Sequence, residues 1–209
     1  MRREILLICG TLSSVLYVVT DLLASWSYKG YSILDQNYSE LLATGASTRP
    51  SMLFVSVVYN LLVASFAVGI WTSASPKRAR HITSAAILGF AILSMITPLF
   101  FPMDMRGASV TPLGSLHPPM TAVSSVFILL SIGFGGYLLG KRFCIYSFVT
   151  IALLLIFGGL TVLQVPQLEA NQSTPWMGFT ERINIYATML WFSLLSVKLL
   201  RAETKQSPA

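Results

Sequence analysis

The sequence predicts an all-α integral membrane protein, a bundle of six transmembrane helices with both chain termini in the cytoplasm. Composition is the first observation behind this class. Of the 209 residues, 54% are hydrophobic and only 11% are charged, whereas a soluble globular domain carries about 25% charged residues. The second observation is that the apolar residues form long continuous runs. Most of the exterior is therefore expected to face lipid.

Six apolar runs are long enough to cross a bilayer, which takes about 20 mostly apolar residues in a helix. Open sheets are excluded because their edge groups would be unsatisfied in lipid, and a β-barrel would show alternating apolar segments. The first run contains Asp21 and is longer than a signal-peptide core, so we expect it to be retained. The predicted spans are Ile5–Ser25, Ser51–Thr72, Ile82–Phe101, Pro118–Leu139, Cys144–Gln164 and Ile183–Leu200.

The domain organisation follows from the short connections between these spans. Residues 1–201 are predicted to form a single six-helix transmembrane domain, and residues 202–209 a disordered cytoplasmic tail. Small residues that recur four apart predict close helix–helix contacts in lipid. These pairs are Gly10 and Ser14, Ser65 and Gly69, Ala85 and Gly89, and Gly136 and Gly140.

The basic residues predict the orientation of the bundle. Short loops rich in Lys and Arg stay in the cytoplasm, and ten of the 14 basic residues fall on the side of the chain termini. The other side holds only Lys29, Arg49, Arg106 and Arg182. The ten residues on the terminal side are Arg2, Arg3, Lys77, Arg78, Arg80, Lys141, Arg142, Lys198, Arg201 and Lys205.

Several functional classes are excluded. The net charge of +6 is explained by the membrane loops, and no nucleic-acid motif is present. P-loop, Rossmann and haem-attachment patterns are absent, so no cofactor is expected. The two histidines, His81 and His117, fall on opposite sides of the membrane, which excludes a multi-histidine zinc centre. Cys9 and Cys144 both lie near the cytoplasmic side, where a disulfide is not expected.

Polar residues gather at the predicted outer ends of the helices. Polar side chains within membrane spans usually face the protein interior, and outer-loop residues can reach the same rim. The segment from Asp35 to Gly45 is predicted to be a short interfacial helix with Asp35 as its N-cap. The expectation is a polar crevice that opens outward. Its candidate residues are Asp21, Glu40, Arg49, Asn60, Asp104, His117, Glu181 and Arg182.

A purely structural interpretation stands beside this functional one. Under it, the four carboxylates Asp21, Glu40, Asp104 and Glu181 would only form ion pairs with Arg49, Arg106 and Arg182 that attach loops to helix ends. Asn60 would make an interhelical hydrogen bond, and His117 would be a hydrogen-bonded residue at a helix start.

Four short motifs resemble a known family. They are Tyr38-Ser39-Glu40-Leu41 with Gly45-Ala46, then Phe101-Pro102-Met103-Asp104, then His117, and finally Glu181-Arg182. Their order and placement are similar to those of the bacterial and archaeal six-helix membrane family called domain of unknown function 998. The resemblance implies the six-helix fold and location in the cytoplasmic membrane of a prokaryote. It implies shared polar residues at Glu40, Asp104, His117, Glu181 and Arg182, and it implies no reaction.

Three functions are compatible with these observations. The first is binding or transport of a lipid or small amphiphile through the outward crevice. The second is an outer-leaflet hydrolase or transferase that uses Asp104 and His117 with Glu40 and Glu181, and with Ser39 or Ser115 as a nucleophile. A metal site of His117 with the carboxylates Glu40, Asp104 and Glu181 belongs to this branch, although no metal is predicted. The third is an accessory subunit that binds another membrane protein or a second copy of the chain.

Overall fold

The computed structural model describes residues 2–73 and 78–204, and within them it contains six helices long and apolar enough to cross a membrane. The predicted all-α six-span bundle is therefore confirmed. Most of the helices are longer than predicted; the last, α7, begins six residues before Ile183. The helices are α1 (Arg2–Ser27), α2 (Arg49–Trp71), α3 (Arg78–Phe100), α4 (His117–Gly135), α5 (Lys141–Val162), α6 (Val165–Glu169) and α7 (Met177–Thr204), with 3-10 turns η1 (Tyr38–Leu42), η2 (Gly114–Leu116) and η3 (Gly136–Leu138).

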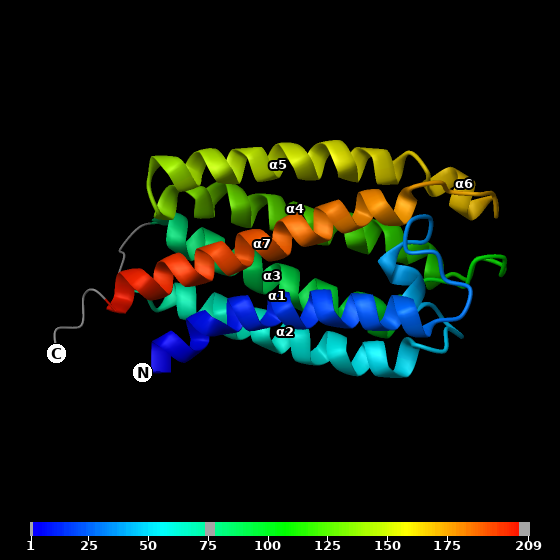
Figure 1. The fold of residues 1–209 in the computed structure, drawn as a ribbon, viewed down its shortest axis with the longest axis horizontal. Coiled ribbons are helices and arrows are strands. Elements are labelled where there is room, and N and C mark those ends of the chain that lie inside the picture. The colour runs from blue at the N-terminus through cyan, green and yellow to red at the C-terminus, as the bar shows by residue number, and fades with distance from the viewer. Residues whose placement is uncertain (1, 74–77, 205–209) are drawn as a thin grey trace.

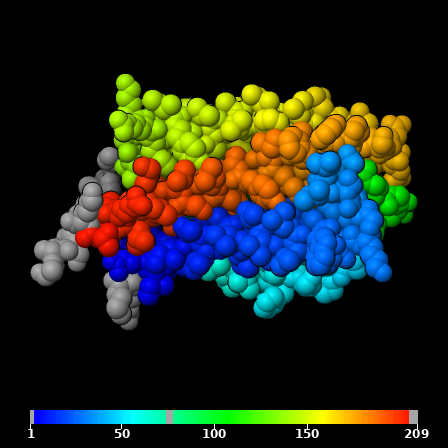
Figure 2. Space-filling view, viewed as in Figure 1, coloured from blue at the N-terminus to red at the C-terminus, as the bar shows by residue number. Residues whose placement is uncertain are grey.

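The six long helices form a closed set of neighbours (Figure 1). The strongest packing joins α1 to α2 and α7, α2 to α3, and α3 to α4. Helix α5 packs mainly against α7 and less extensively against α4. Figure 2 shows α7 lying between α1 and α5 along one side of the molecule. Large side chains fill the centre, and Phe66, Trp191 and Phe192 are fully buried.

Small residues allow the helices to approach closely. A Cβ added at Gly69 of α2 would lie 2.9 Å from Leu6 Cβ and 3.1 Å from the backbone of α1. A Cβ at Gly10 would meet the Phe66 ring at 2.9 Å, and one at Gly89 would meet Phe127 at 2.6 Å. The predicted close contacts at these glycines are confirmed. Gly140 is different, because it has a φ of +86° in the turn before α5 and no atom within 4 Å of an added Cβ.

The two ends of the bundle differ in structure. At one end Arg3 of α1 forms an ion pair with Glu203 of α7 at 2.8 Å, so the first and last helices meet there. Helix α7 extends through Thr204, so residues 202–204 are helical rather than part of the expected tail. Residues 205–209 and Lys77 lie outside the described residues. Lys77 is one of the basic residues from which the orientation was predicted. The opposite end, the loop end, carries the long α1–α2, α3–α4 and α5–α7 connections (Figure 1).

The α1–α2 connection covers the loop end and contains η1 (Figure 2). The predicted N-cap at Asp35 is wrong. Asn37 caps this turn instead: its side chain accepts from Glu40 N, and the Glu40 carboxylate accepts from Asn37 N, which forms a capping box. Asp35 lies before the turn and accepts a hydrogen bond from Trp176 N. The helix ends at Leu42, before Gly45, whose φ is +96°.

Candidate functional site

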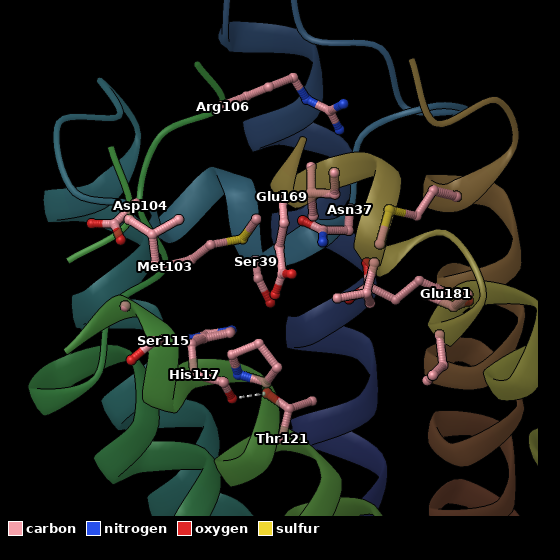
Figure 3. Close-up of a pocket in the computed structure, with 18 of the residues that line it drawn as sticks. Asn37, Ser39, Met103, Asp104, Arg106, Ser115, His117, Thr121, Glu169 and Glu181 are labelled. Carbon is pink, nitrogen blue, oxygen red and sulfur yellow. Dashed lines mark hydrogen bonds between the residues drawn. The ribbon is translucent and has the colours of Figure 1, made fainter. Parts of the chain in front are cut away.

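A cavity of about 240 Å³ lies at the loop end of the bundle (Figure 3). We call it the loop-end cavity. Its walls come from the α1–α2 and α3–α4 connections, the first turns of α4, the end of α5, α6 and the start of α7. The polar lining residues include Asn37, Ser39, Asp104, Arg106, Ser115, His117, Thr121, Glu169 and Glu181. The apolar lining residues include Met103, Met105, Val110, Ala122, Val162, Val165, Leu168 and Met177.

The structure separates the predicted site residues into two sets. Asp104, His117 and Glu181 line the loop-end cavity, with Asp104 and His117 on one side in Figure 3 and Glu181 on the other. The remaining candidates are not among the lining residues and have other contacts. These are Asp21, Glu40, Arg49, Asn60 and Arg182.

Asp21 and Arg182 form a buried ion pair that joins α1 to α7. The Arg182 Nε donates to Asp21 Oδ2 at 2.9 Å and its Nη2 donates to Asp21 Oδ1 at 2.9 Å. Asp21 is 0% exposed and Arg182 is 5% exposed. The Arg182 Nη1 donates to the carbonyl groups of Ile33 and Gln36 at 2.9 and 3.1 Å. This pair therefore holds the α1–α2 connection against α7.

Two tyrosines complete this network. Tyr186 donates to Asp21 Oδ2 at 2.6 Å, and Tyr31 accepts from Arg182 Nη2 at 2.8 Å. Tyr31 in turn donates to the carbonyl of Asn37 at 2.7 Å. Burial raises the pKa of Tyr31, so its phenol stays protonated and continues to donate. The network thus combines charged and neutral groups that are hydrogen-bonded to one another, and its role is structural.

Glu40 and Arg106 form a second ion pair, which covers the cavity. Arg106 Nη2 and Nε donate to Glu40 Oε1 and Oε2 at 2.8 and 3.1 Å. The same guanidinium donates to Thr174 Oγ1 at 3.0 Å and to the Gln172 carbonyl at 3.3 Å. We call this set of contacts the Arg106 roof. It connects all three loop-end connections over the cavity.

Arg49 and Asn60 do not line the loop-end cavity and form no ion pair with a residue that the structure describes. Arg49 donates to the carbonyl groups of Leu42 and Pro98, the latter at 3.1 Å, and so attaches η1 and α3 to the start of α2. Asn60 donates to the Ser56 carbonyl of its own helix at 2.8 Å. The expected interhelical bond from Asn60 is absent among the described residues.

Asp104 is held in place by the chain that follows it. Its carboxylate accepts from Thr111 N at 2.7 Å and from Thr111 Oγ1 at 3.1 Å. A Cβ added at Gly114 would lie 2.0 Å from Asp104 Oδ2, so only glycine fits at that position. Asp104 thus closes a tight turn at the cavity wall. It forms no ion pair with a described residue.

His117 has a defined tautomer. Its Nδ1 lies 2.8 Å from the carbonyl of Phe101, which can only accept, so Nδ1 carries the proton. Nε2 has no hydrogen-bond partner among the described residues and is left as the basic nitrogen. The hydrogen bonds of Asp104 and His117 therefore go to different partners, Thr111 and Phe101.

Glu181 is a cavity carboxylate with a single hydrogen-bond partner. It accepts a hydrogen bond of 2.5 Å from Tyr38 N and forms no ion pair with any residue that the structure describes. Arg182, its neighbour in sequence, points to Asp21 instead. Successive residues of a helix are rotated by about 100°, so Glu181 faces the cavity while Arg182 faces the buried network.

Asn37 is a lining residue that the sequence analysis did not select. Its Oδ1 caps η1, and its Nδ2 has no hydrogen-bond partner within residues 2–73 and 78–204. The residue is 8% exposed. The spacing Asn37-x-x-Glu40 is a capping-box pattern and could have located the turn. Burial also raises the pKa of the adjacent Tyr38, which keeps its phenol neutral.

Across the described chain, no three His, Cys, Asp or Glu side chains gather as a metal site would require. Glu40, Asp104, His117 and Glu181 accordingly do not form such a group. Cys9 and Cys144 are free.

Comparison with known proteins matches the chain to one family model. The family described as "Protein of unknown function (DUF998)" matches residues 11–198. No curated protein and no solved structure matches the chain. The family match covers almost the whole six-helix bundle, including both sides of the loop-end cavity. The chain therefore belongs to the DUF998 family.

Proposed function

We propose that the protein binds a lipid or small amphiphile in the loop-end cavity. The observation that carries the proposal is the position of the cavity between polar connections and lipid-facing helices. Thr121, Ala122 and Ser125 of α4 and Val162 of α5 line the cavity and are exposed on the bundle surface. Because α5 packs mainly against α7, a lateral opening between α4 and α5 would let a hydrocarbon chain extend into the bilayer.

The size of the cavity supports an amphiphile with only one end enclosed. Pockets that hold a complete drug-sized ligand measure about 300–1,000 Å³, and this one measures about 240 Å³. A head group with a short part of its chain would fill it. The remaining chain would lie along the exposed apolar residues of α4 and α5, such as Val126 and Leu155. Transport would require the same site to open toward both sides of the membrane.

The test is photo-crosslinking in lipid nanodiscs with an amphiphile that carries a diazirine on its chain. We expect crosslinks to concentrate on lining residues near Ala122 and Val162. Ala122→Trp should fill the opening and reduce these crosslinks by at least about tenfold, equivalent to about 1.4 kcal/mol. Val123→Trp, exposed on the same helix but outside the lining, is the matched control. Crosslinks spread evenly along α4 and α5, and unchanged by Ala122→Trp, would overturn the proposal.

A hydrolase is the second candidate, and the tautomer of His117 favours it. Its basic Nε2 could accept a proton from a serine hydroxyl, and Ser39 and Ser115 share the cavity lining. Asp104 would not orient this histidine, because Phe101 does so. Hydrolysis of a lipid ester by purified protein, lost in both His117→Gln and one of Ser39→Ala or Ser115→Ala, would establish the activity. Hydrolysis unaffected by His117→Gln would reject it.

A further inference from the structure

We infer that the amphiphile bound in the loop-end cavity carries an ammonium group with a neutral oxygen acceptor beside it, as a long-chain amino alcohol does. This inference rests on the proposed function and names the class of head group. Two independent features of the cavity support it. One is an excess of carboxylates without cationic partners. The other is the amide N–H group of Asn37, which lines the cavity and has no acceptor among the described residues.

The charges of the lining favour a cation. Three carboxylates line the cavity, those of Asp104, Glu169 and Glu181. Arg106 is the one cationic side chain among the lining residues described, and its guanidinium is already bound to the carboxylate of Glu40. The positive charge of Arg106 is therefore neutralised by a residue outside the lining. The cavity keeps carboxylates with no cationic partner, and a cation placed near them gains more in a low-dielectric site than in water.

Glu181 is the carboxylate best placed to bind that cation. Its single hydrogen bond comes from Tyr38 N, which leaves carboxylate lone pairs free for further donors. An ammonium group offers up to three N–H donors. Asp104 already accepts two hydrogen bonds from Thr111, and Glu169 is exposed near the rim. The ammonium is therefore assigned to Glu181, with the other two carboxylates adding to the negative potential.

The amide of Asn37 offers a hydrogen-bond donor to the ligand. Its Nδ2 has no partner in the described parts of the chain although the residue is 8% exposed. Figure 3 shows the amide above the space between Ser39 and Glu181. The Nδ2 atom is not fully enclosed by protein atoms, so it can donate into the cavity to a ligand oxygen that displaces water. An oxygen next to the ammonium would satisfy Nδ2 while the ammonium contacts Glu181.

The same charges exclude an anionic oxygen as that acceptor. A phosphate or sulfate would lie among three carboxylates, and the lining offers no cation that is free to neutralise it. A hydroxyl or ether oxygen accepts from Asn37 without this repulsion. The head group is thus cationic overall.

The test compares four ligands with the same chain in nanodiscs: 2-amino-1-dodecanol, dodecylamine, 1-dodecanol and dodecyl phosphate. Each is used to displace the photoreactive amphiphile from the wild-type protein at neutral pH. We expect affinity to fall in that order, with at least tenfold between the amines and 1-dodecanol. Equal affinities for all four would overturn the head-group inference and leave the proposed function standing. If none of the four competes and the amphiphile does not crosslink at the lining, both fail.

Two variants locate the effect. Glu181→Gln keeps an oxygen for Tyr38 N and should reduce the affinity of both amines at least tenfold, with 1-dodecanol unchanged. Asn37→Ser keeps an N-cap acceptor and should remove the advantage of 2-amino-1-dodecanol over dodecylamine. Glu169→Gln, at the exposed rim, is the matched control and should change each affinity less than threefold. A Glu181→Gln variant that weakens all four ligands equally would overturn the assignment of the charge to Glu181.

Discussion

Arg182 shows how one residue can determine the arrangement of a whole connection. All three of its guanidinium nitrogens donate, and their acceptors come from α1, the α1–α2 connection and α7. A buried charge is tolerated only when it is paired and its hydrogen bonds are satisfied. The Asp21–Arg182 pair is therefore a structural element of the loop end. It fixes the α1–α2 connection, whose Tyr38 N donates to Glu181.

Arg182→Met should destabilise the protein by about 3–5 kcal/mol, because Asp21 would be left buried and unpaired. The Ile33 and Gln36 carbonyl groups would lose their donor as well. Denaturant unfolding in detergent measures this effect. Arg3→Met is the control, since its pair with Glu203 is partly exposed and should contribute less than about 1 kcal/mol. Equal losses for the two variants would contradict the structural role of Arg182.

Asp35 predicts a dependence of stability on pH. Hydrogen bonds from Ser32 and from Trp176 N lower the pKa of this carboxyl group below its ordinary value near 3.8. A lowered folded-state pKa stabilises the fold above pH 3.8, and this stabilisation is lost as the pH falls through the folded-state value.

Asp35→Asn should therefore lower the melting temperature at pH 7, and the difference from wild type should shrink below pH 3.8. Thermal unfolding between pH 3 and pH 7 tests this expectation. A difference that stays constant over the range would show that the contact does not depend on the charge of Asp35.

At the scale of the elements, the close approach of α1 and α2 depends on glycine. Gly69→Ala would place a Cβ 3.1 Å from the backbone of α1, which a side-chain rotation cannot relieve. We expect a loss of about 1–3 kcal/mol, as for other overpacked positions. Gly159→Ala in α5 is the matched control. No atom lies within 4 Å of its Cβ position, so the variant should be neutral or slightly more stable. Denaturant unfolding distinguishes the two.

The Arg106 roof predicts how access to the cavity is controlled. Arg106→Met removes the contacts that join the three loop-end connections, so labelling of Ser39→Cys by a bulky maleimide should accelerate. A rise of about tenfold corresponds to about 1.4 kcal/mol of lost contact energy. The background carries Cys9→Ser and Cys144→Ser. Lys29→Met removes an exposed loop-end charge as the control, and acceleration there to the same degree would show a general charge effect.

At the scale of the whole molecule, the cavity and the ion pairs Asp21–Arg182 and Glu40–Arg106 lie at the end of the bundle that carries the long connections seen in Figure 1. The other end joins α1 to α7 and carries the starts of α3 and α5, with Arg78 and Lys141. We propose that this basic end is cytoplasmic, because short basic loops are retained inside. The loop-end cavity would then face the outer leaflet.

Cysteine labelling of intact cells tests the orientation. In the cysteine-free background, the exposed loop-end variant Ser47→Cys should react with a membrane-impermeant maleimide. Lys141→Cys, at the other end, should react only after the membrane is permeabilised. The reverse pattern would place the loop-end cavity in the cytoplasm and would move its ligand to the inner leaflet.

The composition of the cavity could be predicted in part. Asp104, His117 and Glu181 were selected from the sequence because polar groups near membrane spans face the interior. Asp21 and Arg182 met the same criterion and proved to be structural. The two groups differ in their partners. The sequence could not predict this difference, because each carboxylate on the rim could pair with any of several arginines.

The sequence by itself determined that lipid surrounds most of this protein and that the chain forms helices. Continuous apolar runs specify six spanning helices because the backbone has no other way to satisfy its hydrogen bonds in lipid. Tertiary structure alone decided which polar groups are used in folding and which remain available. Asp21 and Arg182 are 161 residues apart and meet only because α1 packs against α7. That packing also turns Glu181 toward the cavity, since neighbouring helix positions point in different directions.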